Sequence, residues 1–480
     1  MVTILIQKKI LNQLKTFLLY NIFMEKTKIK FGTDGFRGII AKDFTFETVE
    51  KIINAISVYL KKRETNKTVI VGYDPRFLAG NFARFCAELL KNYGFKVILS
   101  KKIVPTPIVA YCAKYYQNSA GAIMLTASHN PKEYQGIKFI PNYGGPAGKE
   151  ITDEIVQYLD QIPFSDSKGE IVEAELDKDY YKHLEKLIDF SAIQKNPPNI
   201  IFDGLYSSSI GYFDKILDKY KIRYESYNMY HDCCFGGGLP EPKPPYLKHS
   251  KKGFITLAND GDADRYGVID ESGNYVHPNT ILALLLRYLV LKGKKGAMIK
   301  TVGVSNLISS VCEKLNIRSI TTPVGFKWLS EAMRNNETIL AGEDSGGLSI
   351  GEHIPEKDGL LANLLIIEMI SKTNKTLTEL QKELMEFVNC TFYTDRVDIK
   401  LENDKKTQEI SEKFLEFQEI ANLKIKEVLT IDGIKFFLDD KLSSLLIRKS
   451  GTEPLLRFYI ESCDKNKLQK IKEFVFEEIK

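Results

Sequence analysis

Short apolar runs that alternate with helical stretches place the strongest constraint on the fold of this chain. An apolar run at 68–72 is followed by a helical stretch that ends near Tyr93, and then by a second apolar run at 96–99. The same alternation returns at 199–258 and at 296–341. Strands that alternate with helices pair in parallel, because each helix carries the chain back across the sheet. The sequence therefore predicts α/β units with mostly parallel sheets.

The last part of the chain has a different pattern. From about Asn389, short strand-like runs follow one another, and a helix is expected from Lys465. Runs of strands without intervening helices are typical of an antiparallel sheet. We therefore expect a small C-terminal α+β domain. A polar stretch at 165–170 marks another boundary.

Length and charge narrow the possible functions. The chain has 480 residues, enough for three or four domains of roughly 150 residues each. Its 67 basic and 62 acidic residues leave a net charge of +5, spread along the chain, which argues against nucleic acid as a partner. The seven cysteines include no Cys-x-x-Cys pair, so we expect reduced thiols in a cytoplasmic protein.

The first 23 residues differ from the rest. They are apolar but interrupted by Lys8, Lys9 and Lys15, which argues against a membrane span. They also lack the small-residue cleavage site of a signal peptide. We interpret residues 1–24 as an N-terminal extension and expect no association with a membrane.

An acidic triplet gives the strongest chemical signal. Asp260, Asp262 and Asp264 alternate with Gly261 and Ala263 directly after an apolar run. The small residues let the backbone curl, so that the three carboxylates converge on one point. Hard oxygen ligands of this kind suit Mg²⁺. The alternative is an acidic surface turn, which the mutual repulsion of three uncompensated carboxylates disfavours.

A serine stands where another apolar run ends. Ser128 follows the run at 121–125, and Asn130–Pro131 forces a turn just after it. Ligands of α/β folds bind at the carboxyl ends of strands. A hydroxyl with basic neighbours, here His129 and Lys138, could act as a nucleophile that carries a group. The alternative is a serine that only bonds the backbone of its own turn.

Further loops carry groups that suit a phosphorylated, hydroxyl-rich ligand. Arg37 lies among three glycines and could face an anion. Glu343 and Ser345 offer acceptors and a donor for sugar hydroxyls. Arg448 opens a stretch whose hydroxyls and amides could hold an oxyanion. That stretch continues with Ser450, Gly451 and Thr452, and Arg457 lies beyond it. Each of these loops, and the loop with His353, could equally be an ordinary polar turn.

Together these motifs resemble those of the α-D-phosphohexomutase family, the phosphoglucomutases and phosphomannomutases. The resemblance extends from about Ile29 to Ser462. It rests on five motifs in the family's order: Phe-Gly-Thr-Asp-Gly-Phe-Arg-Gly at 31–38, Thr-Ala-Ser-His-Asn-Pro at 126–131, Asp-Gly-Asp-Ala-Asp-Arg at 260–265, Gly-Glu-Asp-Ser-Gly-Gly at 342–347 and Ser-Gly-Thr-Glu-Pro at 450–454. Two positions depart from the family pattern, since Gln135 replaces the usual Asn and Ala263 the usual Gly. Both changes affect fine geometry rather than chemistry.

The resemblance implies three consecutive αβα domains with mixed, mostly parallel sheets and a C-terminal α+β domain, arranged around a central cleft. The expected units are an N-terminal extension (1–24), a phosphoserine domain (25–164), a metal-binding domain (165–276), a sugar-binding domain (277–388) and a phosphate-binding domain (389–480).

The resemblance also implies a role for each motif. Ser128 would be the phosphoserine, and Lys138 the general acid and base, with His129, Arg37 and His353 assisting. One Mg²⁺ per chain would be held by Ser128, Asp260, Asp262 and Asp264. The implied substrate-binding residues are Gly325, Phe326 and Lys327 in a sugar-orientation loop, Glu343 and Ser345 on hydroxyls, Arg265, and a distal-phosphate group of Arg448, Ser450, Gly451, Thr452 and Arg457.

The implied reaction interconverts hexose 1-phosphate and hexose 6-phosphate, an isomerase activity of carbohydrate metabolism. Phosphoserine would give its phosphoryl group to the free sugar hydroxyl. The resulting hexose 1,6-bisphosphate, both intermediate and activator, would turn over in the site before Ser128 takes the other group. Mg²⁺ and the basic groups would stabilise the charge on the transferring oxygens. We expect the last domain to close, because water would hydrolyse the phosphoenzyme.

Glucose or mannose phosphate is the expected substrate. The glucosamine mutases usually carry a Thr-rich stretch after the sugar loop, whereas this chain has Ile-Pro-Glu-Lys-Asp-Gly at 354–359. A phosphoglucosamine mutase remains an alternative, as do a Mg²⁺-dependent sugar phosphatase and a sugar-phosphate-binding protein without turnover. The expected partners are small sugar phosphates, and the chain is expected to be a monomer or a homodimer.

Overall fold

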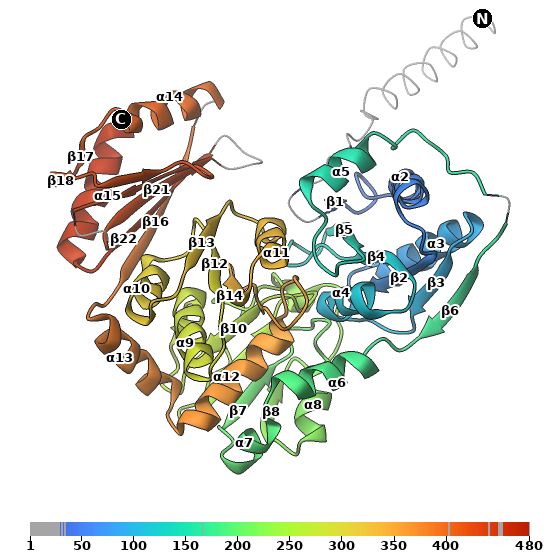
Figure 1. The fold of residues 1–480 in the computed structure, drawn as a ribbon, viewed down its shortest axis with the longest axis horizontal. Helices are drawn as coiled ribbons and strands as arrows, with labels where there is room; N and C mark the ends of the chain where they lie inside the picture. Colours follow the sequence, from blue (N-terminus) through green and yellow to red (C-terminus); the bar gives the residue numbers. More distant parts are fainter. Residues whose placement is uncertain are drawn as a thin grey trace, which may run out of the picture.

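A computed structural model describes residue 29, residue 32 and residues 35–165, 167–401, 404–439, 442–449 and 455–479 (Figure 1). The expected N-terminal extension (1–24) lies outside these residues, as do Ser450, Gly451 and Thr452. Among the helices of these ranges, none combines the length and the apolar character that a bilayer span requires.

The first sheet carries Ser128 just beyond one of its inner strands. Its strand order is β1-β5-β4-β2-β3-β6, with β2, β3, β4 and β6 parallel and with β5 antiparallel to both β4 and β1. The strands are β1 (Phe36–Ile39), β2 (Thr68–Tyr73), β3 (Lys96–Ser100), β4 (Ser119–Leu125), β5 (Tyr134–Pro141) and β6 (Glu170–Ala174), and the helices are α2 (Phe46–Arg63), α3 (Ala79–Asn92), α4 (Thr106–Tyr115) and α5 (Lys149–Val156). β6 takes this sheet beyond residue 164, where the sequence pattern places the start of the second unit.

Helices cover both faces of the first sheet. On one face, Val69 and Val71 belong to the apolar cluster of α2 and α3. On the other face, Ile70 belongs to the cluster that includes α4. β4 is therefore buried along its whole length. Burial on both faces explains why these strands appear in the sequence as continuous apolar runs.

The second sheet ends in a hairpin that carries the acidic triplet. Its strand order is β11-β10-β9-β7-β8, with β7, β8 and β9 parallel and with β10 and β11 antiparallel. The strands are β7 (Ile200–Asp203), β8 (Tyr224–Tyr227), β9 (Ile255–Asn259), β10 (Tyr266–Ile269) and β11 (Tyr275–Val276), and the helices are α6 (Lys178–Leu187), α7 (Phe190–Lys195) and α8 (Phe213–Lys219), with a short turn of helix, η1 (Phe235–Gly237). Asp260, Asp262 and Asp264 form the β9–β10 connection.

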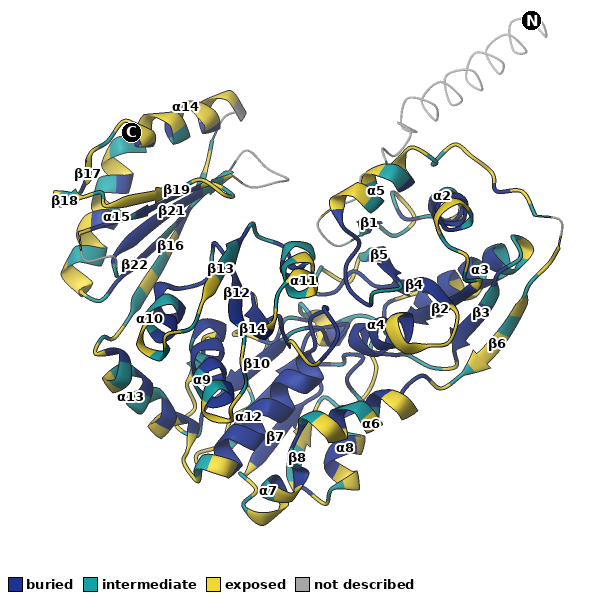
Figure 2. Cartoon of the chain, in the orientation of Figure 1, coloured by how far each residue is buried: buried dark blue, intermediate teal, exposed yellow. Residues whose placement is uncertain are grey.

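The third sheet has the order β13-β12-β14-β15, parallel except for β15. The strands are β12 (Ala297–Thr301), β13 (Ser319–Thr322), β14 (Thr338–Gly342) and β15 (Leu348–Ile350), and the helices are α9 (Pro278–Leu291), α10 (Asn306–Leu315), α11 (Phe326–Asn335), α12 (Gly359–Thr373) and α13 (Leu377–Val388). α12 contacts β9, β10 and β15, so it joins the second sheet to the third. Figure 2 shows this helix buried on nearly all sides.

The fourth sheet is antiparallel throughout, in the order β16-β22-β21-β20-β19, as the sequence predicts. The strands are β16 (Tyr393–Lys400), β19 (Glu427–Leu429), β20 (Ile434–Phe437), β21 (Ser444–Lys449) and β22 (Leu455–Ser462), with a small hairpin of β17 (Glu419–Ile420) and β18 (Leu423–Lys424) and with the helices α14 (Asp404–Leu415) and α15 (Lys465–Ile479). This unit stands to one side, at upper left in Figure 1, and has its own apolar core. The observed elements confirm the predicted fold class of three αβα units and a C-terminal α+β unit.

One expectation about the cysteines is wrong. Cys390 and Cys463 form a disulfide, with Cα atoms 5.8 Å apart, although 73 positions separate them in the sequence. They meet because β16 and β22 pair side by side, with Tyr393 opposite Ser462. The remaining five cysteines, at positions 86, 112, 233, 234 and 312, are free.

Candidate active site

Ser128 lies in a strained and buried turn after β4. Its φ of 51° falls in the left-handed region that residues other than glycine rarely adopt. The residue is 1% exposed. Its amide donates a 2.8 Å hydrogen bond to Thr126 Oγ1, and this hydroxyl donates a 2.6 Å bond to Asp74 Oδ2. Because Asp74 follows β2, the neighbouring strand holds the Ser128 turn in place.

Arg76 completes the support of this turn. Its guanidinium donates to the carbonyl oxygens of Ser128 (2.7 Å), Asn130 (2.6 Å), Pro131 (2.8 Å) and Tyr134 (3.0 Å). It also pairs with Asp74 at 3.2 Å, and both side chains are fully buried. Sequence reasoning missed Arg76 as a site residue. The available signal was its place, since it ends the loop after β2, the strand parallel to β4.

The three aspartates converge beside Ser128, as their spacing predicts. Asp260, Asp262 and Asp264 are fully buried, and one oxygen of each lies within 4.8 Å of the others. Ser128 Oγ donates a 2.8 Å hydrogen bond to Asp260 Oδ2. A Cβ atom at Gly261 would lie 2.6 Å from the Ser128 carbonyl oxygen. The close approach of the two loops therefore requires glycine at position 261.

Two buried lysines face the aspartates. Lys138 Nζ, from β5, lies 2.9 Å from Asp262 Oδ2 and 3.1 Å from Asp264 Oδ2. Lys357 Nζ lies 3.0 Å from Asp264 Oδ2, and its side chain is 4% exposed. A Cβ atom at Gly347 would lie 2.5 Å from Lys357 Cδ, so glycine leaves room for the lysine stem. Sequence reasoning missed Lys357, because it used the stretch 354–359 only to compare substrates.

Burial and neighbouring charges shift the pKa values of Asp260 and Asp262 in different directions. Burial raises the pKa of Asp260 well above its usual value, and repulsion from Asp264 and Asp262 raises it further. Burial would also raise the pKa of Asp262, but the nearby Lys138 ammonium and a hydrogen bond from Thr106 hold it well below its usual value. Asp262 is thus paired with a lysine inside the protein, whereas the positive charge near Asp260 does not offset its burial and the repulsion from the other two aspartates.

The residues present fit a divalent cation. Asp262 Oδ1 and Asp264 Oδ1 are buried and have no hydrogen-bond partner among the described residues. Buried polar atoms are normally hydrogen-bonded, so two carboxylate oxygens without a hydrogen bond in one cluster need an explanation. Oxygen ligands of this kind are those that Mg²⁺ prefers.

His129 and Arg37 complete this side of the site. His129 Nδ1 lies 3.3 Å from Ser128 Oγ. The Arg265 guanidinium, together with burial, lowers the pKa of His129 well below its usual value, so the ring is neutral at neutral pH. Arg37, on β1, donates a 2.5 Å hydrogen bond from Nη1 to Asn130 Oδ1. Two of the three predicted assisting residues, His129 and Arg37, therefore contact Ser128 or its turn.

The predicted hydroxyl-binding residues lie next to the aspartate loop. Ser345 Oγ donates a 3.3 Å hydrogen bond to Glu343 Oε2. Burial raises the pKa of Glu343. The Tyr266 amide donates a 3.0 Å bond to the Gly346 carbonyl, and Arg265 forms a β-bridge with Gly347. The turn after β14 is thus joined directly to the end of the metal loop.

The predicted sugar-orientation loop begins α11. Gly325 has a φ of 118°, which suits glycine, and precedes the helix. Phe326 is buried, and its ring centroid lies 5.4 Å from Lys357 Nζ. Lys327 is half-buried with its Nζ 5.3 Å from the Trp328 ring, and burial lowers its pKa. The start of α11 therefore reaches the lysine that faces the aspartates through Phe326.

The fourth sheet reaches this loop through one aspartate. Arg448 and Arg457 lie opposite each other on β21 and β22. Arg448 Nη2 lies 2.8 Å from Asp432 Oδ2, and the same oxygen accepts a 2.9 Å hydrogen bond from the Val324 amide. The predicted phosphate-binding arginine is thus coupled to the residue that precedes Gly325.

His353 lies behind the site rather than in it. Its Nε2 donates a 2.8 Å hydrogen bond to Asp358 Oδ2, and the residue is 2% exposed. Its ring faces those of His183 and Tyr180, 5.1 and 6.1 Å away. These contacts do not include Ser128, so a direct role for His353 in the reaction stays a prediction.

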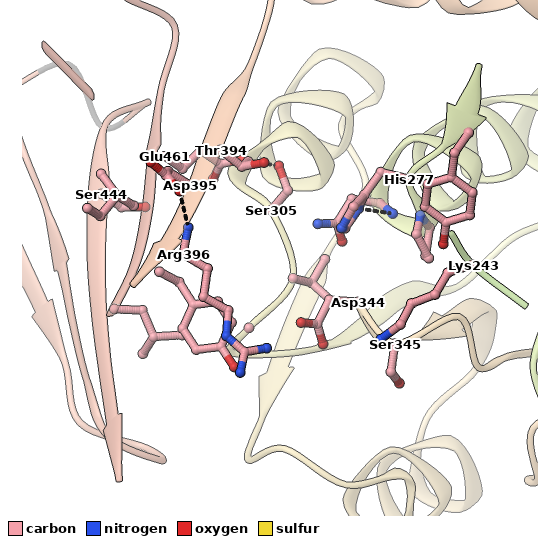
Figure 3. A pocket seen from close by; sticks show the side chains of 18 of the residues that line it. Lys243, His277, Ser305, Asp344, Ser345, Thr394, Asp395, Arg396, Ser444 and Glu461 are labelled. Carbon is pink, nitrogen blue, oxygen red and sulfur yellow. Dashed lines mark hydrogen bonds between the residues drawn. The ribbon is translucent and has the colours of Figure 1, made fainter. Parts of the chain in front are cut away.

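A cavity of about 580 Å³ extends from the site to the fourth sheet (Figure 3). Its lining includes Arg265, which directly follows Asp264, and Ser345, which hydrogen-bonds to Glu343. Arg396 and Glu461 line it from the fourth sheet. Glu461 accepts hydrogen bonds from the Ser305 hydroxyl and from the Asn306 amide, the latter at 2.7 Å, and so anchors the fourth sheet to the start of α10.

Comparison with known proteins covers almost the whole chain. Four family profiles match in order: "Phosphoglucomutase/phosphomannomutase, alpha/beta/alpha domain I" at 28–166, domain II of the same description at 178–273, domain III at 277–388, and its C-terminal domain at 397–478.

Individual relatives match over similar lengths. A phosphoglucomutase/phosphomannomutase of Thermococcus kodakarensis is 29% identical over 91% of this chain and 95% of its own. A phosphoglucosamine mutase of Methanocaldococcus jannaschii is 31% identical over 90% of this chain and 94% of its own. Among solved structures, a provisionally named phosphomannomutase from Thermus thermophilus has a TM-score of 0.82 and 32% identity, and the match covers 94% of this chain and 98% of the other.

Proposed function

Because this chain belongs to the phosphoglucomutase/phosphomannomutase family of phosphohexomutases, which are isomerases, we propose that Ser128 is the residue that carries the transferred phosphoryl group. The observation that carries this proposal is the 2.8 Å hydrogen bond between Ser128 Oγ and Asp260 Oδ2. A hydroxyl held in a fixed turn beside three buried carboxylates is suited to accept and release a phosphoryl group. A cation bound by the carboxylates would compensate the negative charge of that group.

The proposed reaction interconverts hexose 1-phosphate and hexose 6-phosphate in two transfers. In the first, the phosphorus–oxygen bond at Ser128 breaks and a bond to the free sugar hydroxyl forms, while Lys138 gives a proton to the departing Ser128 Oγ and takes the proton of the sugar hydroxyl, so that it remains an ammonium. The resulting hexose 1,6-bisphosphate turns over within the site. In the second, the bond between the sugar oxygen and the other phosphoryl group breaks and Ser128 Oγ takes that group, while Lys138 gives a proton to the sugar oxygen and takes the proton of the Ser128 hydroxyl.

The protein's own groups would prepare both transfers. Arg76 fixes the Ser128 turn through four carbonyl oxygens, so the reacting oxygen does not have to be positioned at each turnover. Lys138 and Lys357 place two positive charges beside the carboxylates. A Mg²⁺ ion held by Ser128, Asp260, Asp262 and Asp264 would supply further stabilisation of charge on the transferring oxygens.

The sugar would be held from the third and fourth units. Glu343 and Ser345 are proposed to bind ring hydroxyls, with Gly325, Phe326 and Lys327 orienting the ring. The phosphate that does not react would bind Arg448 and Arg457, with Arg265 and the residues 450–452. The separate apolar core of the fourth unit supports its movement as a body, which would exclude water when the site closes.

We propose glucose or mannose phosphate as the substrate, from the absence of a Thr-rich stretch at 354–359. Glucosamine phosphate is the second candidate, because relatives of similar identity are named phosphoglucosamine mutase. A sugar phosphatase would use the same aspartates without keeping the phosphoryl group.

One assay tests these alternatives together. The purified protein is incubated with Mg²⁺, a trace of the matching hexose 1,6-bisphosphate and, in turn, glucose, mannose or glucosamine 1-phosphate. The 6-phosphate formed and the inorganic phosphate released are both measured. We expect 6-phosphate without stoichiometric phosphate release, fastest with glucose or mannose. Phosphate release without isomerisation would exclude the mutase, and a preference for glucosamine would reverse the substrate assignment.

A further inference from the structure

Lys357 owes its place to the start of α12. Asp358 caps this helix, since its Oδ1 accepts 2.9 Å hydrogen bonds from the amides of Leu360 and Leu361. The Gly359 amide donates a 3.1 Å bond to the Ala263 carbonyl in the aspartate loop. A Cβ atom at Gly359 would lie 2.4 Å from the Arg265 carbonyl oxygen. The first turn of α12 therefore packs directly against the metal loop, and any shift of that turn moves Lys357.

The second oxygen of Asp358 is held from another part of the chain. Asp358 Oδ2 accepts a 2.7 Å hydrogen bond from Tyr180 Oη and a 2.8 Å bond from His353 Nε2. Tyr180 lies on α6, which precedes the second sheet, and is fully buried. These hydrogen bonds to the carboxylate are made inside the protein, where charge-assisted bonds are strong and their loss is costly.

Aromatic rings enclose this carboxylate on the side away from the site. The His353 ring stacks on that of His183 at 5.1 Å and 20°. Tyr111, on α4 of the first unit, contacts Tyr180 at 5.8 Å and His183 at 5.3 Å. Burial lowers the pKa of His183 to about 4, so its ring is neutral at neutral pH. The three αβα units meet at this point.

We propose that Tyr180 is a positioning residue for the reaction: through Asp358, its hydroxyl sets the first turn of α12 and so holds Lys357 Nζ against Asp264. This inference rests on the proposed phosphohexomutase function. The proposal gives α6 an indirect part in turnover, although none of its residues faces Ser128 or the aspartate triplet. His353 would have the same indirect part, instead of direct contact with the reacting groups.

Removal of the Tyr180 hydroxyl would shift the position of Lys357 without removing any group that faces the aspartate triplet. Asp358 would keep its bonds to Leu360 and Leu361 but would lose the tyrosine partner at Oδ2. The turn could then relax towards α6, and the ammonium of Lys357 would move with it. A displacement of about 1 Å in a preorganised charge is enough to reduce turnover by roughly 10- to 100-fold, with less effect on substrate binding.

Two tyrosines that are neighbours in the sequence provide a matched test. Tyr180→Phe removes the hydroxyl that reaches Asp358. Tyr181→Phe makes the same chemical change on the same helix, where the hydroxyl instead donates a 3.4 Å bond to the Tyr212 carbonyl. We expect kcat of Tyr180→Phe to fall at least about tenfold with KM within about twofold, while Tyr181→Phe keeps both. Equal kcat values for the two variants, at equal thermal midpoints, would overturn the proposal.

A double-variant cycle separates positioning from general loosening. If Tyr180 acts through Lys357, Tyr180→Phe should change kcat less than about twofold in a Lys357→Met background. A loss in that background as large as in the wild-type protein would also overturn the proposal. Should Tyr180→Phe fail to fold, Asp358→Asn replaces it in the same cycle, because the amide oxygen can still cap α12. A wild-type protein that isomerises no hexose phosphate would refute the proposed function instead, which keeps the two failures distinct.

Discussion

The Ser128 hydroxyl donates a 2.8 Å hydrogen bond to Asp260, a residue 132 positions further along the chain and on a different sheet. The bond joins the turn after β4 to the turn after β9, so the first and second sheets meet through their strand ends. Ligands of α/β sheets bind at such carboxyl ends. The contact thus places the reacting hydroxyl and the acidic cluster in one site.

Ser128→Ala is expected to abolish hexose phosphate isomerisation, because the variant lacks the hydroxyl that accepts the phosphoryl group in this turn. Mass spectrometry of the wild-type protein, treated with hexose 1,6-bisphosphate and then digested, should locate phosphate on the peptide that contains Ser128. Phosphate on a different residue, or an active Ser128→Ala variant, would contradict the assignment.

Asp262→Asn is expected to lower kcat strongly in the presence of Mg²⁺, because an amide binds the cation more weakly and leaves Lys138 with one fewer carboxylate. Circular dichroism should show an unchanged fold. The control is Asp270→Asn, since Asp270 Oδ1 holds the turn at Ser272 and Asn274, away from the aspartate triplet. Chelator treatment should inactivate the wild type, and elemental analysis after readdition should find about one Mg²⁺ per chain. Equal rates for both variants would remove the metal assignment.

Gly261→Ala is expected to reduce kcat at least about tenfold, because the new Cβ atom would lie 2.6 Å from the Ser128 carbonyl oxygen and would push the two loops apart. Gly80→Ala on α3 serves as the control, since its Cβ atom would find its nearest neighbour at an ordinary 3.4 Å. Steady-state kinetics of both variants, with thermal midpoints to exclude unfolding, provide the measurement. Full activity in Gly261→Ala would mean that the spacing of the loops is not critical.

Lys435 should make stability rise with pH. It is buried between the fourth and third sheets, near the carbonyl oxygens of Val302 and Val304. Burial, together with repulsion from Lys300, lowers its pKa to about 7 from 10.5. Between these two values the unfolded chain holds the proton and the folded chain does not. The cost of burying the charge is therefore complete below pH 7 and disappears towards pH 10.5.

The comparison of wild type with Lys435→Met isolates this effect. The free energy of unfolding of the wild type should rise by up to about 1.4 kcal/mol per pH unit between about pH 7 and 9, relative to the variant. Guanidinium denaturation at three pH values across this interval measures both slopes. Parallel slopes would show that Lys435 keeps its proton in the folded protein.

The Cys390–Cys463 disulfide predicts a thiol count. In denaturant without reductant, a chromogenic thiol reagent should react with the five free cysteines, and after reduction with all seven. Because the bond closes a loop over a sequence separation of 73, Cys390→Ser should lower the free energy of unfolding by about 2–4 kcal/mol. Seven reactive thiols before reduction would restore the expectation of reduced cysteines.

Much of the architecture could be predicted from local pattern. The expected runs at 68–72 and 96–99 lie within β2 and β3, because strands buried on both faces are continuous apolar runs between turns. The helix α12 was not predicted, although it is among the most buried elements of the chain. A helix with apolar residues on every side lacks the period of 3.6 residues by which surface helices are recognised.

The residues of the candidate site fall into two groups, those that the sequence indicates and those that only the structure shows. Ser128 and the aspartate triplet could be found from the sequence, because each stands in a short motif whose chemistry depends on neighbouring residues. The sequence analysis did not find Arg76, Lys357 or Tyr180, since each acts on a partner that is distant in the chain. Arg76 reaches carbonyl oxygens 52 to 58 positions away, and Tyr180 reaches a carboxylate 178 positions away.

The sequence by itself determined the kinds of unit, their order and the loops that carry chemistry, because backbone preferences, burial patterns and motif spacing act over a few residues. Only the tertiary structure decided which loops meet, which lysines face the aspartates and which buried groups hold them there. Those relationships arise when strand ends from different sheets pack together. Distances across such contacts are set by the packing of whole units, which no local stretch of sequence encodes.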